Sequence, residues 1–153
     1  MKIGIISDTH GHLEPRVERI FKGVNHILHA GDIGYASIAL ELQMIAPVTA
    51  VLGNCDDLPG FPLTAVVTLG GKKFLVHHIV TPHDLQDGVA ARIKKESPDV
   101  VVFGHTHKRY NETRDGILFL NPGYSGKPKL GSERSVAILH LEPAGLRTEF
   151  IPL

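Results

Sequence analysis

Short apolar runs alternate with helix-like segments in the first third of the chain. Residues 2–6 form an apolar run that predicts a strand, and residues 13–23 carry apolar positions at helical spacing before a glycine. A strand at 26–29, a helix at 37–45 and a strand at 48–52 are predicted to continue that order. This alternation indicates an α/β protein whose sheet has a parallel component.

The rest of the chain is predicted to form mainly β-hairpins around one helix. Gly-Gly and Asp-Gly pairs mark two of the turns, as is typical of hairpins. The predicted strands and helix are 64–69, 72–77, helix 83–96, 100–103, 110–114, 117–120, 135–141 and 146–151. Two mixed sheets covered by helices would account for both halves. No repeat, low-complexity tract or linker divides the sequence, so we expect one domain over residues 1–153.

Composition narrows the class of protein. A chain of 153 residues that is 42% hydrophobic can bury a sizeable core. Sixteen Lys and Arg balance sixteen Asp and Glu, and this neutral charge argues against nucleic acid as a partner. Cys55 is the only cysteine, which excludes an intrachain disulfide. The start of the chain does not resemble a signal peptide and no apolar run reaches membrane-spanning length, so we expect a cytoplasmic protein without a membrane partner.

Metal-ligand side chains gather directly after predicted strands. In open α/β sheets, ligands bind in the crevice beyond the carboxyl ends of the strands. Five strand ends therefore point seven candidate ligands toward one edge: Asp8, His10, Asp32, Asn54, His77, His105 and His107. Any one of these motifs alone is as typical of a surface loop or a half-buried histidine. All of them in this order favour a metal site.

The ligand types fit a site for two ions. Asp, His and the Asn carbonyl suit borderline divalent ions such as Mn, Fe, Zn, Co or Ni, whereas an all-oxygen set would suit Ca. Alternate residues of an extended segment, as in Asp8-x-His10 and His105-x-His107, can face one side. A glycine precedes Asp32, Asn54 and His105, and it allows the backbone to approach the ions closely.

These motifs, taken as a set over about residues 1–125, resemble those of the calcineurin-like metallophosphoesterases. The short length, the opening Ser7-Asp8-Thr9-His10-Gly11-His12 and the Asn121-Pro122-Gly123 turn resemble the small YfcE-like phosphodiesterase branch. The resemblance implies a four-layer αββα sandwich with two mixed β-sheets and with metal ions at one sheet edge.

The resemblance also implies a role for each candidate residue. Asp8, His10 and His107 would hold one divalent ion, Asn54, His77 and His105 the other, and Asp32 would bridge them. Mn²⁺ is the first expectation for the ion, with Ni²⁺, Fe²⁺, Zn²⁺, Co²⁺ and Mg²⁺ as alternatives. A hydroxide bridging the two ions would attack a phosphate ester, preferably a diester, without a covalent enzyme intermediate.

The sequence departs from the family pattern at two positions. Many members have a histidine after the Asn ligand, where it can protonate the leaving group, but here the residue is Cys55. The family usually has a glycine after the His77 ligand, but here it is His78, which could line the substrate pocket or merely occupy a loop. His29 could support the ligands from behind, and His12 could reach substrate or begin the following helix. His26, His83 and His140 read as structural or exposed.

Two other functions compete with a phosphoesterase acting on a small phosphate ester. The first is a non-catalytic, metal-binding interaction scaffold like the retromer subunit that shares this fold. A scaffold tolerates the loss of ligands, whereas all seven positions are filled here. The second is a nuclease, for which the chain offers little spare length and no basic surplus. The apolar hairpins are compatible with a monomer, a dimer or a tetramer.

Overall fold

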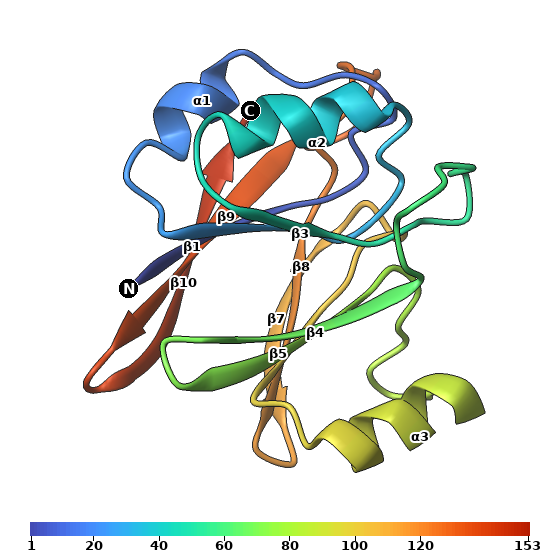
Figure 1. Cartoon of the computed structure of the whole chain (residues 1–153), viewed down its shortest axis with the longest axis vertical. Helices are drawn as coiled ribbons and strands as arrows, with labels where there is room; N and C mark the ends of the chain where they lie inside the picture. The colour runs from blue at the N-terminus through green and yellow to red at the C-terminus, as the bar shows by residue number, and fades with distance from the viewer.

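The structure, a computed structural model, describes all residues 1–153 and arranges ten strands and three helices in four layers. Helices α1 (Arg16–Ile20) and α2 (Ala36–Gln43) lie on the outer side of one sheet, and α3 (Asp87–Glu96) lies beyond the other (Figure 1). The expected α/β sandwich with two mixed sheets is confirmed.

The first sheet joins the two ends of the chain. Its order is β10-β9-β1-β2-β3, where the strands are β1 (Lys2–Ile6), β2 (His26–His29), β3 (Val48–Ala50), β9 (Ser135–Glu142) and β10 (Gly145–Pro152). β1 pairs in parallel with β2, and β2 with β3, as the alternation predicted. β9 pairs antiparallel with β1 and with β10, so the last hairpin of the chain completes the sheet that the first strand begins.

The second sheet combines two hairpins with a parallel centre. Its order is β4-β5-β6-β8-β7, where the strands are β4 (Thr64–Leu69), β5 (Lys72–His77), β6 (Val100–Val102), β7 (Arg109–Arg114) and β8 (Ile117–Pro122). β4–β5 and β7–β8 are the predicted antiparallel hairpins. β5, β6 and β8 run parallel, which gives this sheet its mixed character.

Apolar side chains fill three spaces between the four layers. Ile3 and Ile5 of β1 meet Val76 and Val102 of the second sheet in the central core. A second cluster packs α1 and α2 on the first sheet, and a third packs α3 on the second. Since side chains alternate between the faces of a strand, β1 contributes Ile3 and Ile5 to the central core and Ile6 to the core beneath α1 and α2.

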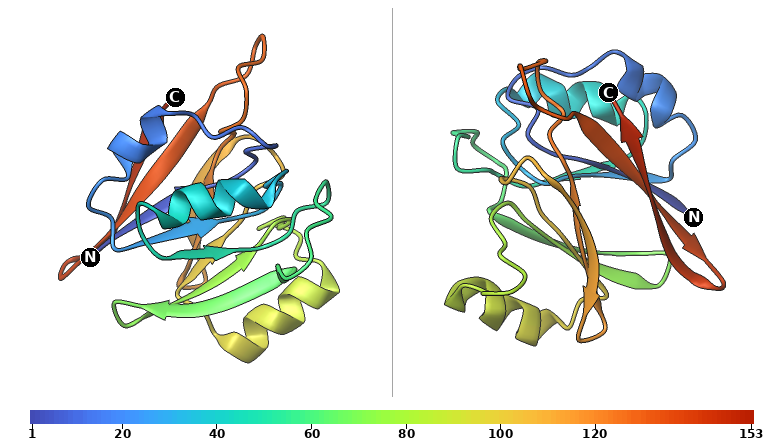
Figure 2. Two further views of the ribbon diagram at one scale, coloured as in Figure 1. Left: turned by 45° about the horizontal axis from the view of Figure 1, so that its top comes forward. Right: turned by 180° about the vertical axis from the view of Figure 1, so that it is seen from behind.

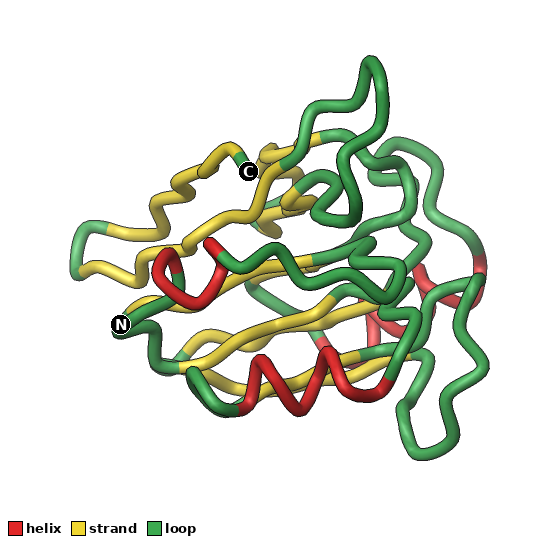
Figure 3. The backbone as a smooth tube through the Cα atoms, turned by 90° about the horizontal axis from the view of Figure 1, so that it is seen from above, coloured by secondary structure: helices red, strands yellow, loops and turns green.

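The parallel strands of both sheets end on the same side of the molecule. Figure 3 shows loops gathered at the end of the molecule that lies away from the N-terminus. The two views of Figure 2 show the loop between β8 and β9 projecting from the body near the N-terminal loop that follows β1. The loops that follow β1, β2, β3 and β6 carry six of the seven candidate ligands, and the seventh, His77, is the last residue of β5.

All three helices are shorter than the sequence pattern predicted, and α2 ends at Gln43 instead of residue 45. The predicted helix 13–23 is reduced to α1, with Pro15 at its N-cap position and Gly23 at φ 83° just beyond it. Proline disfavours helical geometry in the residue before it, so the helix does not extend further upstream. The predicted helix 83–96 begins at Asp87, because Gln86 is extended. None of the three helices has the length and apolar character needed to cross a bilayer.

Candidate metal centre

The loops after β1 and β2 run side by side and place Asp8, His10 and Asp32 together. The Asp8 N–H donates to Gly31 O at 3.0 Å, and the His10 N–H donates to Asp32 O at 2.9 Å. These bonds continue the parallel pairing of the two strands beyond their ends. The loops are therefore as fixed as the sheet from which they emerge.

The backbone is strained where the candidate ligands lie. Seven residues other than glycine have a positive φ, and five of them are candidate ligands: Asp8, His10, Asp32, His105 and His107. Such a conformation costs about 1 kcal/mol or more per residue, and persists only where the surrounding structure imposes it. Its concentration at one edge marks a functional site.

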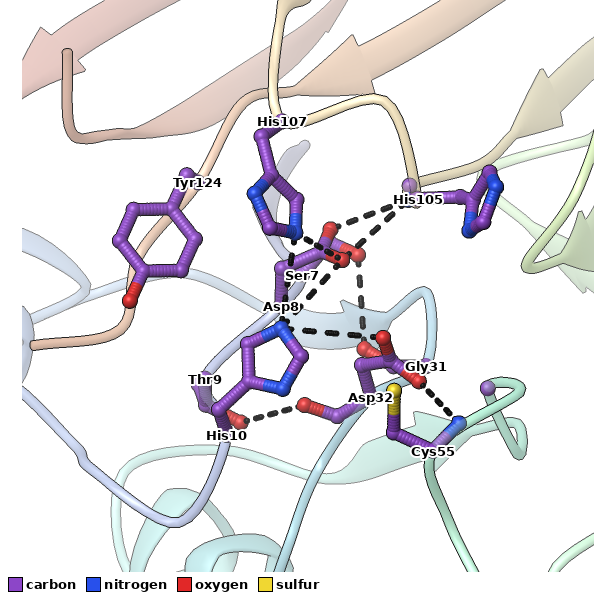
Figure 4. Close-up of polar contacts among 12 residues, drawn as sticks. Ser7, Asp8, Thr9, His10, Gly31, Asp32, Cys55, His105, His107 and Tyr124 are labelled. Carbon is purple, nitrogen blue, oxygen red and sulfur yellow. Dashed lines mark hydrogen bonds and ion pairs between the residues drawn. The ribbon is translucent and has the colours of Figure 1, made fainter. Parts of the chain in front are cut away.

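Asp8, His10 and His107 form the first group that could hold a cation. His107 Nε2 lies 3.3 Å from Asp8 Oδ1, and the Nε2 atoms of His10 and His107 are 3.5 Å apart. Figure 4 shows both imidazole rings directed at the carboxylates. Burial raises the pKa of Asp8 and lowers the pKa of His107. Both shifts reflect charged forms that need a compensating partner.

His78, rather than His77, completes the cluster around Asp32. His78 Nδ1 lies 2.7 Å from Ala30 O, which only accepts, so Nδ1 carries the proton. Its bare Nε2 is buried without a hydrogen-bond partner and lies 3.4 Å from Asp32 Oδ2. A buried lone pair facing a carboxylate is unfavourable unless a cation lies between them. The residues present therefore fit a divalent metal ion.

The structure does not bring His77 to the cluster. Its Nδ1 pairs with Thr64 Oγ1 at 2.8 Å on the neighbouring strand β4. The cause is the alternation of side chains along β5. Phe74 and Val76 face the central core, and His78 continues that face, whereas His77 follows Leu75 toward α3.

Asn54 and His105 contact each other, and His105 also adjoins Asp8 and His78. The His105 N–H donates to the Asp8 carboxylate at 3.2 Å, and its Nδ1 lies 2.9 Å from Asn54 Oδ1. The rings of His105 and His78 are 5.4 Å apart. Asp32 Oδ2 is 3.7 Å from His10 Nε2 and 3.4 Å from His78 Nε2, so one carboxylate oxygen is near both histidines. The structure thus gathers Asp8, His10, Asp32 and His107 with His78 in place of His77. It pairs the other two predicted residues, Asn54 and His105, with each other next to that group.

Asp56 fastens two of these loops to one another and so shapes the loops, as expected from its place in the sequence. Its carboxylate accepts from the backbone N–H groups of Ile33, Gly34 and Gly53 at 2.8–2.9 Å. Burial alone would raise the pKa of Asp56, but the three donors outweigh it and lower the pKa. The loops that bear Asp32 and Asn54 are consequently held at a fixed spacing.

His29 and Cys55 lie close to the cluster in different ways. His29 is fully buried, and burial lowers its pKa to about 4. Its Nδ1 accepts from the Gly31 N–H, so Nε2 donates to Thr9 Oγ1, 2.9 Å away. Cys55 donates its N–H to Asp32 Oδ1 at 2.9 Å, and its thiol is within 4.8 Å of ligand atoms of His10 and Asp32. His29 therefore braces the loop backbone, and Cys55 lies at the cluster itself.

Comparison with known proteins agrees with this geometry. Residues 1–144 match the family model of the calcineurin-like phosphoesterase superfamily domain. A probable metallophosphoesterase from Methanothermobacter thermautotrophicus is 32% identical over 99% of this chain and 92% of its own length. Phosphodiesterase YfcE from Escherichia coli K12 is 33% identical over 91% of this chain and 87% of its own length.

Solved structures share the fold along the whole chain. One described as a novel archaeal phosphodiesterase has 29% identity and a TM-score of 0.78, covering 99% of this chain and 100% of its own. Vps29 from Entamoeba histolytica, at 22% identity and a TM-score of 0.76 over 100% of this chain and 99% of its own, shows the fold alone. The family match and the relatives above 30% identity lead to one assignment: the chain belongs to the calcineurin-like phosphoesterase superfamily and is a metallophosphoesterase.

Proposed function

We propose that this chain is a phosphodiesterase that requires two divalent metal ions, with Mn²⁺ as the ion used. Relatives named as phosphodiesterases support the choice of a diester. The mixture of imidazole and carboxylate donors suits Mn²⁺ and similar ions better than Ca²⁺. The observation that carries the proposal is the buried, unpartnered Nε2 of His78 opposite Asp32 Oδ2.

The proposed ligands divide into two sets that share one carboxylate. Asp8, His10 and His107 would hold the first ion, and their mutual distances of 3.3–4.0 Å support this set. His78, His105 and Asn54 would hold the second, and Asp32 would contact both. His78 replaces His77 in this set because His77 faces α3.

When bound, the ions would supply positive charge for the phosphoryl oxygens and would lower the pKa of water that attacks phosphorus. The residues of the chain orient the ligands before substrate arrives. Ala30 O fixes the tautomer of His78, and the backbone N–H groups of Cys55 and His105 hold the Asp32 and Asp8 carboxylates. Because this arrangement is built into the loops, little reorganisation is needed during the reaction.

We further propose that residues 1–153 act as one domain on a small phosphate ester in the cytoplasm. Both sheets contribute to the central core, which supports a single folding unit. A formal net charge of zero favours a small ester over a nucleic acid.

The proposal is tested with bis(p-nitrophenyl) phosphate and p-nitrophenyl phosphate, each assayed with Mn²⁺ and with a chelator. The wild-type protein should cleave the diester faster than the monoester and lose activity in the chelator. Asp32→Asn and His78→Gln should each lower kcat/KM for the diester by about 100-fold or more, since the first removes the negative charge of the shared carboxylate and the second removes an imidazole ligand. His77→Gln is the matched control, and it should keep kcat/KM within about threefold, because its ring faces away from the cluster.

Loss of activity in His77→Gln but not in His78→Gln would overturn the ligand assignment. Absence of diester turnover with every divalent ion, in a folded protein that binds metal, would reject the phosphodiesterase. That second result would favour a non-catalytic scaffold of the same fold.

A further inference from the structure

A lysine is held against the aromatic wall of the candidate site. The Tyr124 ring is buried, and its centre lies 4.8 Å from the His107 ring centre and 6.0 Å from that of His10. Figure 4 shows Tyr124 beside His107 on the side away from His105. The Nζ atom of Lys129 lies 4.7 Å from the Tyr124 ring centre. Lys129 Nζ and the His107 ring centre are therefore separated by no more than the 4.7 Å and 4.8 Å distances to Tyr124 added together.

The loop that carries Lys129 is fastened at both ends. Arg134 Nε donates to Gly126 O at 2.7 Å, and the Ser135 N–H donates to Tyr124 O at 2.8 Å. The Tyr124 hydroxyl donates to Lys127 O at 3.0 Å. Within the loop, the Ser132 N–H and hydroxyl both donate to Lys129 O. Lys129 thus extends from a closed turn beside the site, not from a free tail.

The charge of Lys129 is not neutralised by the protein. The nearby Arg134 is paired with Glu14 at 2.8 Å, whereas Lys129 forms no ion pair. An ammonium over an aromatic face keeps its hydrogen-bond donors available on the other side. It is therefore free to contact an anion that lies beside the Tyr124 ring.

We propose that Lys129 forms a subsite for a second anionic group, a phosphate, on the ester that the site cleaves. The inference rests on the proposed phosphodiesterase and specifies its substrate class: organic phosphodiesters that carry an additional phosphate a few bonds from the scissile one. A simple diester such as bis(p-nitrophenyl) phosphate has no group for this subsite.

Two substrates that differ only in that group test the subsite. They are the p-nitrophenyl ester of thymidine 5′-phosphate and the same ester with a 3′-phosphate. The wild-type protein with Mn²⁺ should show a kcat/KM about fivefold higher for the second ester, the size expected for one partly exposed charge pair. Lys129→Gln should abolish the preference by lowering kcat/KM for the second ester. Lys127→Gln, in the same loop without the aromatic contact, should keep the preference.

Equilibrium binding separates the subsite from catalysis. By calorimetry, thymidine 3′,5′-bisphosphate should bind more tightly than thymidine 5′-phosphate to the wild-type protein but not to Lys129→Gln, and the difference should shrink as salt is raised. Equal affinities in the wild-type protein, or an equal preference in Lys129→Gln, would overturn the subsite. Absence of turnover of both esters would reject the phosphodiesterase instead, and the binding comparison would then decide the subsite by itself.

Discussion

Single glycines allow the loops to approach the carboxylates of the site. A Cβ on Gly104 would lie 2.6 Å from Asp8 Oδ2 and would overlap Ser7 Oγ. A Cβ on Gly53 would overlap Asp32 Oδ1. Neither glycine has a positive φ, so the lack of space, and not backbone conformation, excludes a side chain at these positions.

We expect Gly104→Ala to damage the site directly. The added methyl group must displace Ser7 and Asp8, which should lower Mn²⁺-dependent diesterase kcat/KM by at least about tenfold. Overpacking of this buried region should also lower the free energy of unfolding by about 1–3 kcal/mol. Urea unfolding and kcat/KM are the two measurements. Unchanged activity would show that Asp8 does not need its present position.

At the scale of elements, α3 contains a glycine that serves as a comparison for Gly104, because it has open space around it. Gly88 lies in its first turn, and a Cβ there would meet nothing within 4 Å. Gly88→Ala should therefore raise the free energy of unfolding by about 0.5–1 kcal/mol, because alanine loses less backbone entropy in a helix. Thermal or urea unfolding measures the gain, and diesterase activity should stay unchanged. A loss of stability would mean that the start of α3 is not helical in solution.

Periodicity was sufficient to predict the strands and the parallel pairs. The strand ends also predicted six of the residues that the structure places at this edge, and the seventh is His78, not the predicted His77. The choice between His77 and His78 was also within reach, since alternation from Phe74 and Val76 places His78 on the inner face. The partners of the Asp56 carboxylate and the contact of Lys129 with Tyr124 could not be predicted in this way. They depend on where loops meet after folding, which local patterns do not encode.

At the scale of the whole molecule, the candidate site depends on contacts between distant parts of the chain. The Asp8 carboxylate receives the N–H of His105, 97 residues away, and the Ser125 hydroxyl donates to Ser7 O across 118 residues. Arg134 and Glu14, 120 residues apart, join the loop between β8 and β9 to the segment before α1. The ligands can therefore converge only once both sheets have formed.

The Glu14–Arg134 pair makes the link between the β8–β9 loop and the segment before α1 dependent on pH. The hydrogen bond from Arg134, followed by that from Arg16, lowers the pKa of Glu14 below its usual value of 4.5. A carboxyl group whose pKa is depressed by folding stabilises the folded state above its unfolded-state pKa. That contribution is lost as the pH falls through the folded-state pKa. Arg134 is only 8% exposed, so losing this partner leaves a nearly buried charge unpaired.

We therefore expect Glu14→Gln to lower the free energy of unfolding by about 1 kcal/mol near neutral pH, with the difference from wild type shrinking as the pH falls below the usual Glu range. Urea unfolding of both proteins at matched pH values measures that difference. Glu18→Gln is the control, because Glu18 lies on α1 and forms no ion pair. If the difference for Glu14→Gln stayed constant at all pH values, packing of the side chain and not its charge would link the two loops. The link between the two loops would then not depend on the protonation state of Glu14.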